Sequence, residues 1–167
     1  MRALQLIAVR CLALVGALFL LAASAEAATV VALGASNTYG KGVERDQAYP
    51  AQLEAMLRAR GLSVNVVNAG INGDTTEGML SRLDDAVPNG TRVVILQPGG
   101  NDLRKGRADR TAEIQSRLRA RGIRVVMLGN SMFRGLPHQP DGVHLTPDGY
   151  RMLARSLASQ VAGAVGR

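Results

Sequence analysis

The sequence of 167 residues predicts an α/β fold in which helices cover both faces of a parallel sheet. Short apolar runs with the composition of buried strands alternate with segments whose apolar residues recur at helical spacing. The connections between them are short, which is typical of parallel strands joined by helical crossovers. The length suits one domain with a sizeable core.

Four apolar runs are the candidate strands, and all are rich in Val, Ile or Leu. We expect them at residues 29–33, 64–67, 92–97 and 124–128. The sheet therefore has four strands, or five if another forms in the long segment 129–145.

Helices are expected between these strands and after the last one. Pro50 opens the first, and Asp74-Thr75-Thr76 begins the second, which carries Met79, Leu80 and Leu83. The third is highly charged and turns Ile114 and Leu118 inward. Thr146 followed by Pro147 has the pattern of an N-cap and first helical residue, so the last helix begins there.

Residues 1–27 have the pattern of a signal peptide. Arg2 and Arg10 precede an apolar run over 11–23, and Ala25-Glu26-Ala27 is a small-x-small cleavage site. The run is shorter than the roughly 20 residues that span a membrane, which favours cleavage over a retained anchor. We expect residues 28–167 to be a single exported domain, periplasmic or secreted from a bacterium, without stable membrane insertion.

The composition excludes several classes of function. The single cysteine, Cys11, lies in the predicted signal, so the mature chain has no disulfide and no thiolate. The net charge is +7, and basic residues cluster over 104–124. Such a patch is typical of nucleic-acid binding, but no aromatic residue is interleaved with it to stack on bases. A solvated helix face is the better interpretation, and no nucleic-acid partner is expected.

Residues that can carry chemistry follow the predicted strands, whose carboxyl ends meet at one edge of the sheet. Ser36 follows the first strand, Gly70 the second and Asn101 the third, while His144 lies in the long segment after the fourth. Asp141 precedes His144 by three residues, a spacing that lets a carboxylate orient the imidazole. Together they supply a nucleophile, a base, an acid and hydrogen-bond donors for an oxyanion, as acyl transfer requires.

Other interpretations of the same residues are less well supported. Thr38 stands where a G-x-S-x-G nucleophile motif has glycine. Residues 34–41 resemble a phosphate-binding loop, but the spacing is one residue too long and Gly42 replaces the hydroxyl that would hold magnesium. His138 and His144 lack the H-E-x-x-H pattern of a metal site. Asp102 and Asp148 are the spare carboxylates that could pair with His144 in place of Asp141.

Four blocks of residues resemble those of the SGNH hydrolases, also called the GDSL esterase/lipase family. They are Gly34-Ala35-Ser36-Asn37, Asn68-Ala69-Gly70-Ile71-Asn72-Gly73, Gly99-Gly100-Asn101-Asp102 and Asp141-Gly142-Val143-His144. Their order and rough spacing also match. The sequence is most similar to the periplasmic thioesterase, lysophospholipase and arylesterase branch.

This resemblance implies a flavodoxin-like three-layer α/β/α fold and a serine ester hydrolase. It implies that Ser36 is the nucleophile, His144 the base and Asp141 the residue that orients it. The Ser36 and Gly70 N–H groups and the Asn101 side chain would form the oxyanion hole. The implied substrate is a small ester or thioester, with no cofactor and no metal.

The chain departs from the family at two places. Ala35 replaces the aspartate of the Gly-Asp-Ser block, and only about a dozen residues separate the fourth strand from Asp141, where relatives carry another helix and strand. The short segment suits a carbohydrate O-acetylesterase on the same triad as an alternative. Both departures together motivate a second alternative, a catalytically impaired binding or envelope protein.

Overall fold

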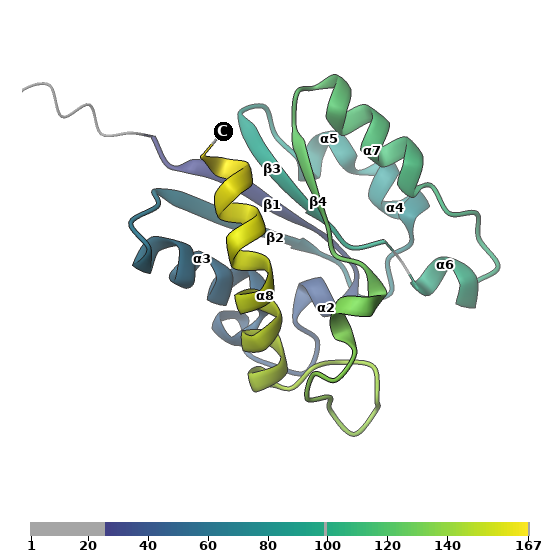
Figure 1. The fold of residues 1–167 in the computed structure, drawn as a ribbon. Coiled ribbons are helices and arrows are strands. Elements are labelled where there is room, and N and C mark those ends of the chain that lie inside the picture. The colour runs from purple at the N-terminus through teal and green to yellow at the C-terminus, as the bar shows by residue number, and fades with distance from the viewer. Residues whose placement is uncertain (1–25, 99, 167) are drawn as a thin grey trace, which may run out of the picture.

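Four parallel strands form a single sheet at the centre of the molecule (Figure 1). The computed structural model describes residues 26–98 and 100–166. The strands lie in the order β2-β1-β3-β4, the doubly wound arrangement of flavodoxin-like folds. Their bounds are β1 (Ala28–Gly34), β2 (Val64–Gly70), β3 (Thr91–Leu96) and β4 (Arg124–Met127). The predicted fold class and all four predicted strands are therefore confirmed.

Helices cover both faces of this sheet and complete a three-layer sandwich (Figure 1). One face carries α3 (Tyr49–Ala59) and α8 (Pro147–Val165), and the other carries α4 (Thr76–Ser81), α5 (Leu83–Ala86) and α7 (Thr111–Ala120). Two short helices, α2 (Ser36–Tyr39) and α6 (Gly100–Arg104), follow β1 and β3 at the carboxyl edge. The 3-10 turns are η1 (Arg45–Gln47) and η2 (Asn130–Phe133).

The core consists of two apolar clusters, one on each face of the sheet. Val30 and Ala32 of β1 belong to the cluster under α3 and α8. Val31 and Leu33 belong to the cluster under α4, α5 and α7. All four side chains are fully buried, because β1 lies in the interior of the sheet and alternate residues point to opposite faces.

The helix ends show why these segments are helical. The hydroxyl oxygens of Thr75 and Thr146 accept hydrogen bonds from the N–H groups of Gly78 and Gly149, at 3.1 and 3.2 Å, as the sequence predicted. The predicted helix carrying Met79, Leu80 and Leu83 is instead divided into α4 and α5, because the backbone leaves the helical conformation at Arg82 (φ −107°, ψ 14°).

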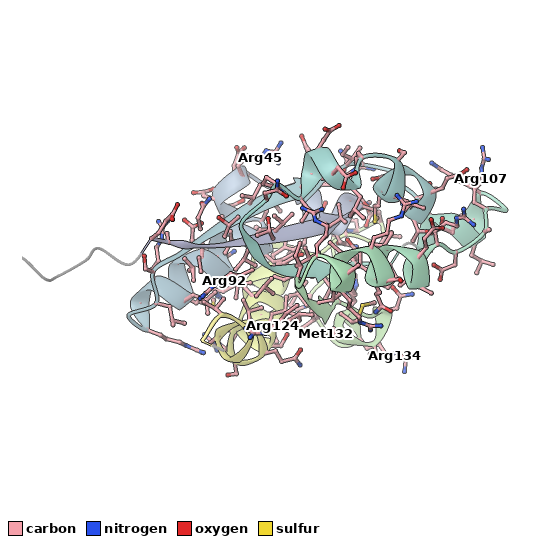
Figure 2. All side chains as sticks on the ribbon, turned by 90° about the horizontal axis from the view of Figure 1, so that it is seen from above. Arg45, Arg92, Arg107, Arg124, Met132 and Arg134 are labelled. Carbon is pink, nitrogen blue, oxygen red and sulfur yellow. The ribbon has the colours of Figure 1, made fainter. Side chains whose placement is uncertain are left out.

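Two arginines from the sheet fix the end of α8. Arg92 of β3 donates to the carbonyl oxygen of Val165, and Arg124 of β4 donates to that of Ala164. Figure 2 shows Arg124 beside the last helix. Guanidinium groups at a helix C-terminus satisfy carbonyls that lack intrahelical partners and complement the helix dipole.

The segment between β4 and α8 contains η2 and a single antiparallel bridge between His138 and Leu145. No fifth strand is present among the described residues, in agreement with the short spacing before Asp141. Residues 1–25 of the predicted signal peptide lie outside the described residues. Within the described parts, no helix has the length and apolar character needed to cross a membrane.

Candidate active site

Ser36 lies at the carboxyl edge of the sheet, in the turn that joins β1 to α2. Gly34 ends β1, and a Cβ atom there would lie 2.2 Å from the Thr38 hydroxyl and 2.8 Å from Gln97 Cβ. Only glycine allows the chain to turn this closely. The turn makes Ser36 the first residue of α2, so its N–H belongs to the helix-terminal amides that have no intrahelical partner.

Ser36, His144 and Asp141 are brought together by the tertiary structure. The Ser36 Oγ lies 2.9 Å from His144 Nε2, and His144 Nδ1 lies 2.5 Å from Asp141 Oδ2. The other oxygen of Asp141 accepts the backbone N–H groups of Val143 and His144, each at 2.9 Å. The hydrogen bond from the His144 side chain, reinforced by these backbone donors, holds the pKa of Asp141 well below its usual range.

The two spare carboxylates lie elsewhere. Asp102 is buried and accepts hydrogen bonds from the Thr76 N–H at 3.0 Å and the Thr76 hydroxyl at 3.1 Å, so it anchors the start of α4. Asp148 pairs with Arg151 on the surface of α8. Of the three carboxylates considered from the sequence, Asp141 is the one in contact with His144.

Gln97 holds the turn around Ser36, a role that the sequence analysis did not identify. Its side-chain oxygen accepts hydrogen bonds from the Ala35 N–H (3.3 Å), the Thr38 N–H (3.2 Å) and the Thr38 hydroxyl (2.7 Å). The methyl group of Ala35 is buried in the apolar cluster under α4 and α7. The backbone around Ala35 is thus held by hydrogen bonds to Gln97. The position of Gln97 directly after β3, at the edge where the site residues lie, was the sequence signal that could have identified this role.

Asn37 is a second residue whose role the sequence did not reveal. Its amide nitrogen donates to the Val143 carbonyl at 3.1 Å, and its oxygen accepts from the Tyr150 hydroxyl at 3.0 Å. Asn37 is buried, and the available sequence signals were its position next to Ser36 and its place in the first of the four family blocks. The residue therefore links the Ser36 turn to both the His144 segment and α8.

Gly70 pairs with Gly34 at the end of the β1–β2 ladder. A Cβ atom there would lie 2.2 Å from the backbone nitrogen of Tyr39, so a glycine is needed for α2 to pack against β2. The Gly70 N–H donates to the Asn68 side-chain oxygen at 3.0 Å. In this structure the amide is therefore engaged by a neighbouring side chain.

Asn101 lies in the first turn of α6 and is buried at the site. Its amide nitrogen donates to the Asp74 carbonyl at 2.6 Å, and its oxygen accepts from the Arg104 guanidinium. Because a guanidinium has only donors, the contact with Arg104 determines which side of the amide carries the oxygen.

A partly buried ion pair braces the strand ends behind the site. Arg82 lies 2.8 Å from Asp74, and it also donates to the carbonyl oxygen of Ala69 at 2.9 Å and more weakly to that of Gly34 at 3.4 Å. The side chains are largely buried, so the charges are paired and hydrogen-bonded, as burial demands. This contact joins the carboxyl ends of β1 and β2.

A cleft of about 300 Å³ opens over Ser36. Its lining is rich in side-chain amides, and its apolar side chains are those of Ala35, Phe133 and Val143. Asn101 and Gln97 line it with Ser36, whereas Gly70 does not. A larger groove of about 660 Å³ between α3 and the start of α8 contains none of the predicted site residues.

Comparisons with known proteins agree with the sequence resemblance. The chain is 36% identical over 125 residues to Esterase TesA of Pseudomonas aeruginosa, covering 71% of this chain and 60% of that protein. It is 33% identical over 99 residues to an arylesterase of Vibrio mimicus, covering 59% of this chain and 50% of that protein. The chain thus spans only about half to three fifths of the length of these curated relatives.

A solved structure and a family model agree with these relatives. AlinE4, described as an SGNH-hydrolase family esterase, is 26% identical, with a TM-score of 0.55 over 83% of this chain and 74% of that one. The model of the GDSL-like lipase/acylhydrolase family matches residues 32–141, from the end of β1 to Asp141. The chain therefore belongs to the GDSL-like lipase/acylhydrolase family, as its four sequence blocks predicted.

Proposed function

We propose that this protein is a serine ester hydrolase that acts through an acyl-enzyme intermediate. The observation that carries the proposal is the continuous set of contacts from Ser36 Oγ to His144 Nε2 at 2.9 Å, and from His144 Nδ1 to Asp141 at 2.5 Å. A hydroxyl, an imidazole and a carboxylate in this order are the parts that nucleophilic acyl transfer needs.

In the first half of the reaction, the Ser36 hydroxyl attacks the carbonyl carbon of an ester or thioester. His144 Nε2 takes the hydroxyl proton as the new C–O bond forms, and Asp141 stabilises the imidazolium through Nδ1. His144 then gives this proton to the leaving alcohol or thiol as its bond to the carbonyl carbon breaks. In the second half, His144 activates a water molecule, which releases the acid and restores Ser36.

The negative charge on the tetrahedral intermediate requires donors held in place beforehand. The backbone N–H of Ser36, the N–H of Gly70 and the side-chain amide of Asn101 are the proposed donors. Gly70 and Asn101 are bonded to Asn68 and to the Asp74 carbonyl in this structure, so the oxyanion would replace or share those acceptors. Each donor is expected to contribute roughly 100- to 1000-fold in rate.

The small cleft favours short acyl groups. Its volume of about 300 Å³ lies at the lower end of ligand pockets, and its apolar side chains are few. We therefore propose short-chain esters as the preferred substrates, with no cofactor or metal. Acetylated sugars should be tested beside these short-chain esters, since a carbohydrate O-acetylesterase would use the same residues.

The test is hydrolysis of 4-nitrophenyl acetate and butyrate by the purified protein beside Ser36→Ala. We expect the variant to lose more than about 1000-fold in kcat. Ser81→Ala is the matched control, because Ser81 is exposed and its hydroxyl bonds only within α4. Diethyl 4-nitrophenyl phosphate should label wild type and Ser81→Ala once, at Ser36, and leave Ser36→Ala unlabelled. Folded protein that neither hydrolyses esters nor reacts with this reagent would overturn the proposal in favour of a binding protein.

We also propose that the mature protein begins at Ala28 and is exported to the periplasm or medium. The support is the basic, apolar and small-x-small order of residues 1–27. Expression of the full chain in a Gram-negative host, followed by fractionation and N-terminal sequencing, tests it. Protein retained in the cytoplasm with residues 1–27 still attached would contradict it.

A further inference from the structure

Among the described residues, one permanently charged side chain lines the cleft over Ser36. Arg104, the last residue of α6, lines it together with the neutral amides of Asn37, Gln97 and Asn101. No aspartate or glutamate is among the described residues that line this cleft. A guanidinium offers five hydrogen-bond donors in a planar fork and accepts none.

Three carboxylates around the candidate site have other partners. Asp102 accepts from Thr76, and Asp74 pairs with Arg82. Asp141 accepts from His144. In residues 26–98 and 100–166, none of the ion pairs within 4 Å includes Arg104, whose guanidinium donates to the neutral oxygen of Asn101.

The two cations that follow Arg104 most closely have partners outside the cleft. Lys105 Nζ donates to the Gly73 carbonyl at 2.6 Å, and Arg107 lies 3.7 Å from Glu77. Neither lines the cleft, and Figure 2 shows Arg107 projecting from the loop beyond α6. The cleft cation is therefore a feature of Arg104 and not of the whole basic segment.

Arg104 is exposed, and no carboxylate lines the described part of the cleft, so its guanidinium can bind an anionic group of a ligand there. The guanidinium fork matches the oxygens of carboxylate and phosphate groups and can bind two of them at once. We propose that this site takes esters carrying a carboxylate or phosphate group near the scissile bond, and that Arg104 binds that group. This inference rests on the proposed ester hydrolase function and adds the substrate class.

Three pairs of substrates, each differing mainly in one anionic group, test the proposal. Mono-4-nitrophenyl adipate against 4-nitrophenyl hexanoate places a carboxylate on the acyl side. The acetyl ester of 4-hydroxybenzoate against that of 4-hydroxybenzamide places it on the leaving group. The acetyl ester of 4-hydroxyphenyl phosphate against phenyl acetate places a phosphate there. For each pair the measured quantity is the ratio of kcat/KM for the anionic ester to that for the neutral one.

We expect wild type to prefer the anionic ester in at least one pair by roughly 10- to 100-fold, the range for one charged hydrogen-bonded contact. Arg104→Gln should bring that ratio to about one, and Arg104→Lys should keep part of it. Arg104→Gln also removes the hydrogen bond to Asn101. Loss of that bond should slow both esters of a pair alike, so it leaves the ratio unchanged, whereas loss of charge recognition lowers the ratio.

Arg107→Gln is the matched control, since it removes one positive charge from the same segment outside the cleft. Its ratio should stay within about twofold of wild type at 0.15 M salt, where charges more than about 8 Å apart are largely screened. The inference would be overturned if wild type gave ratios of one or less in all three pairs, or if its preference for the anionic ester survived in Arg104→Gln. Neither result would affect the proposed ester hydrolase function. Absence of Ser36-dependent hydrolysis of any of the six esters would overturn both.

Discussion

Asn37 donates a hydrogen bond of 3.1 Å to the carbonyl oxygen of Val143, and so joins the residue after Ser36 to the residue before His144. Ser36 and His144 are 108 positions apart in the chain, yet their side chains lie 2.9 Å apart. Tyr150 donates to the oxygen of the same amide and thereby orients it. Asn37 therefore links the segment of the proposed nucleophile to that of the proposed base.

Replacing Asn37 should impair catalysis while leaving binding nearly intact. Asn37→Ala removes the bond to the Val143 carbonyl, so the His144 segment is no longer held to the Ser36 turn. We expect kcat for 4-nitrophenyl acetate to fall roughly 10- to 100-fold with little change in KM, because small misplacements of reacting groups cost about this much. Tyr150→Phe retains the Val143 contact and should lose less. Equal kcat in Asn37→Ala and wild type would show that the link is dispensable.

Asp141→Asn should be severely damaging to turnover. The amide favours the wrong imidazole tautomer and cannot stabilise the imidazolium, a change that lowers kcat on the order of 10⁴-fold in serine proteases. Steady-state kinetics with a short-chain ester checks this. The control is Asp148→Asn, since Asp148 contacts Arg151 on the surface. Near-normal turnover in Asp141→Asn would remove this carboxylate from the mechanism.

The lowered pKa of Asp141 also predicts how stability depends on pH. Its pKa in the folded protein is below the ordinary value of 3.8, so unfolding takes up a proton in acid. The stabilisation from Asp141 is therefore complete above pH 3.8 and is lost as pH falls through the lower folded value. Urea unfolding at pH 5, 4 and 3 should show the stability difference between wild type and Asp141→Asn shrinking on acidification. A difference that grows toward pH 3 would contradict the assigned direction.

Gln97 is expected to stabilise the folded protein by holding the turn around Ser36. Gln97→Leu leaves three donors around the Ser36 turn without their acceptor, at a cost of about 2–4 kcal/mol in the free energy of unfolding. Gln97→Glu keeps an acceptor oxygen for the same donors and should cost less than Gln97→Leu, although its charge must be desolvated at this buried position. Urea denaturation of the three proteins measures this order. Equal losses in both variants would show that these hydrogen bonds do not stabilise the turn.

Much of the fold follows from local patterns that the sequence displays. The β-branched runs predicted all four strands, and Thr75 and Thr146 predicted two helix starts, because strand burial and N-capping depend on residues close together in the chain. The division of α4 from α5 at Arg82 was not predicted. At that residue the Arg82 side chain pairs with Asp74 and reaches the carbonyl oxygens of Ala69 and Gly34, contacts that the spacing of apolar residues does not predict.

The sequence alone determined the parallel α/β architecture, the family and the blocks that contain Ser36, Asp141 and His144, since each depends on residue type and on short spacing. Tertiary structure decided which groups meet. It placed Gln97 under the Ser36 turn and Arg104 in the cleft, and it engaged the Gly70 N–H with Asn68. These contacts form when the carboxyl ends of separate strands converge at one edge of the sheet, and no local pattern records which side chains then lie within hydrogen-bonding distance.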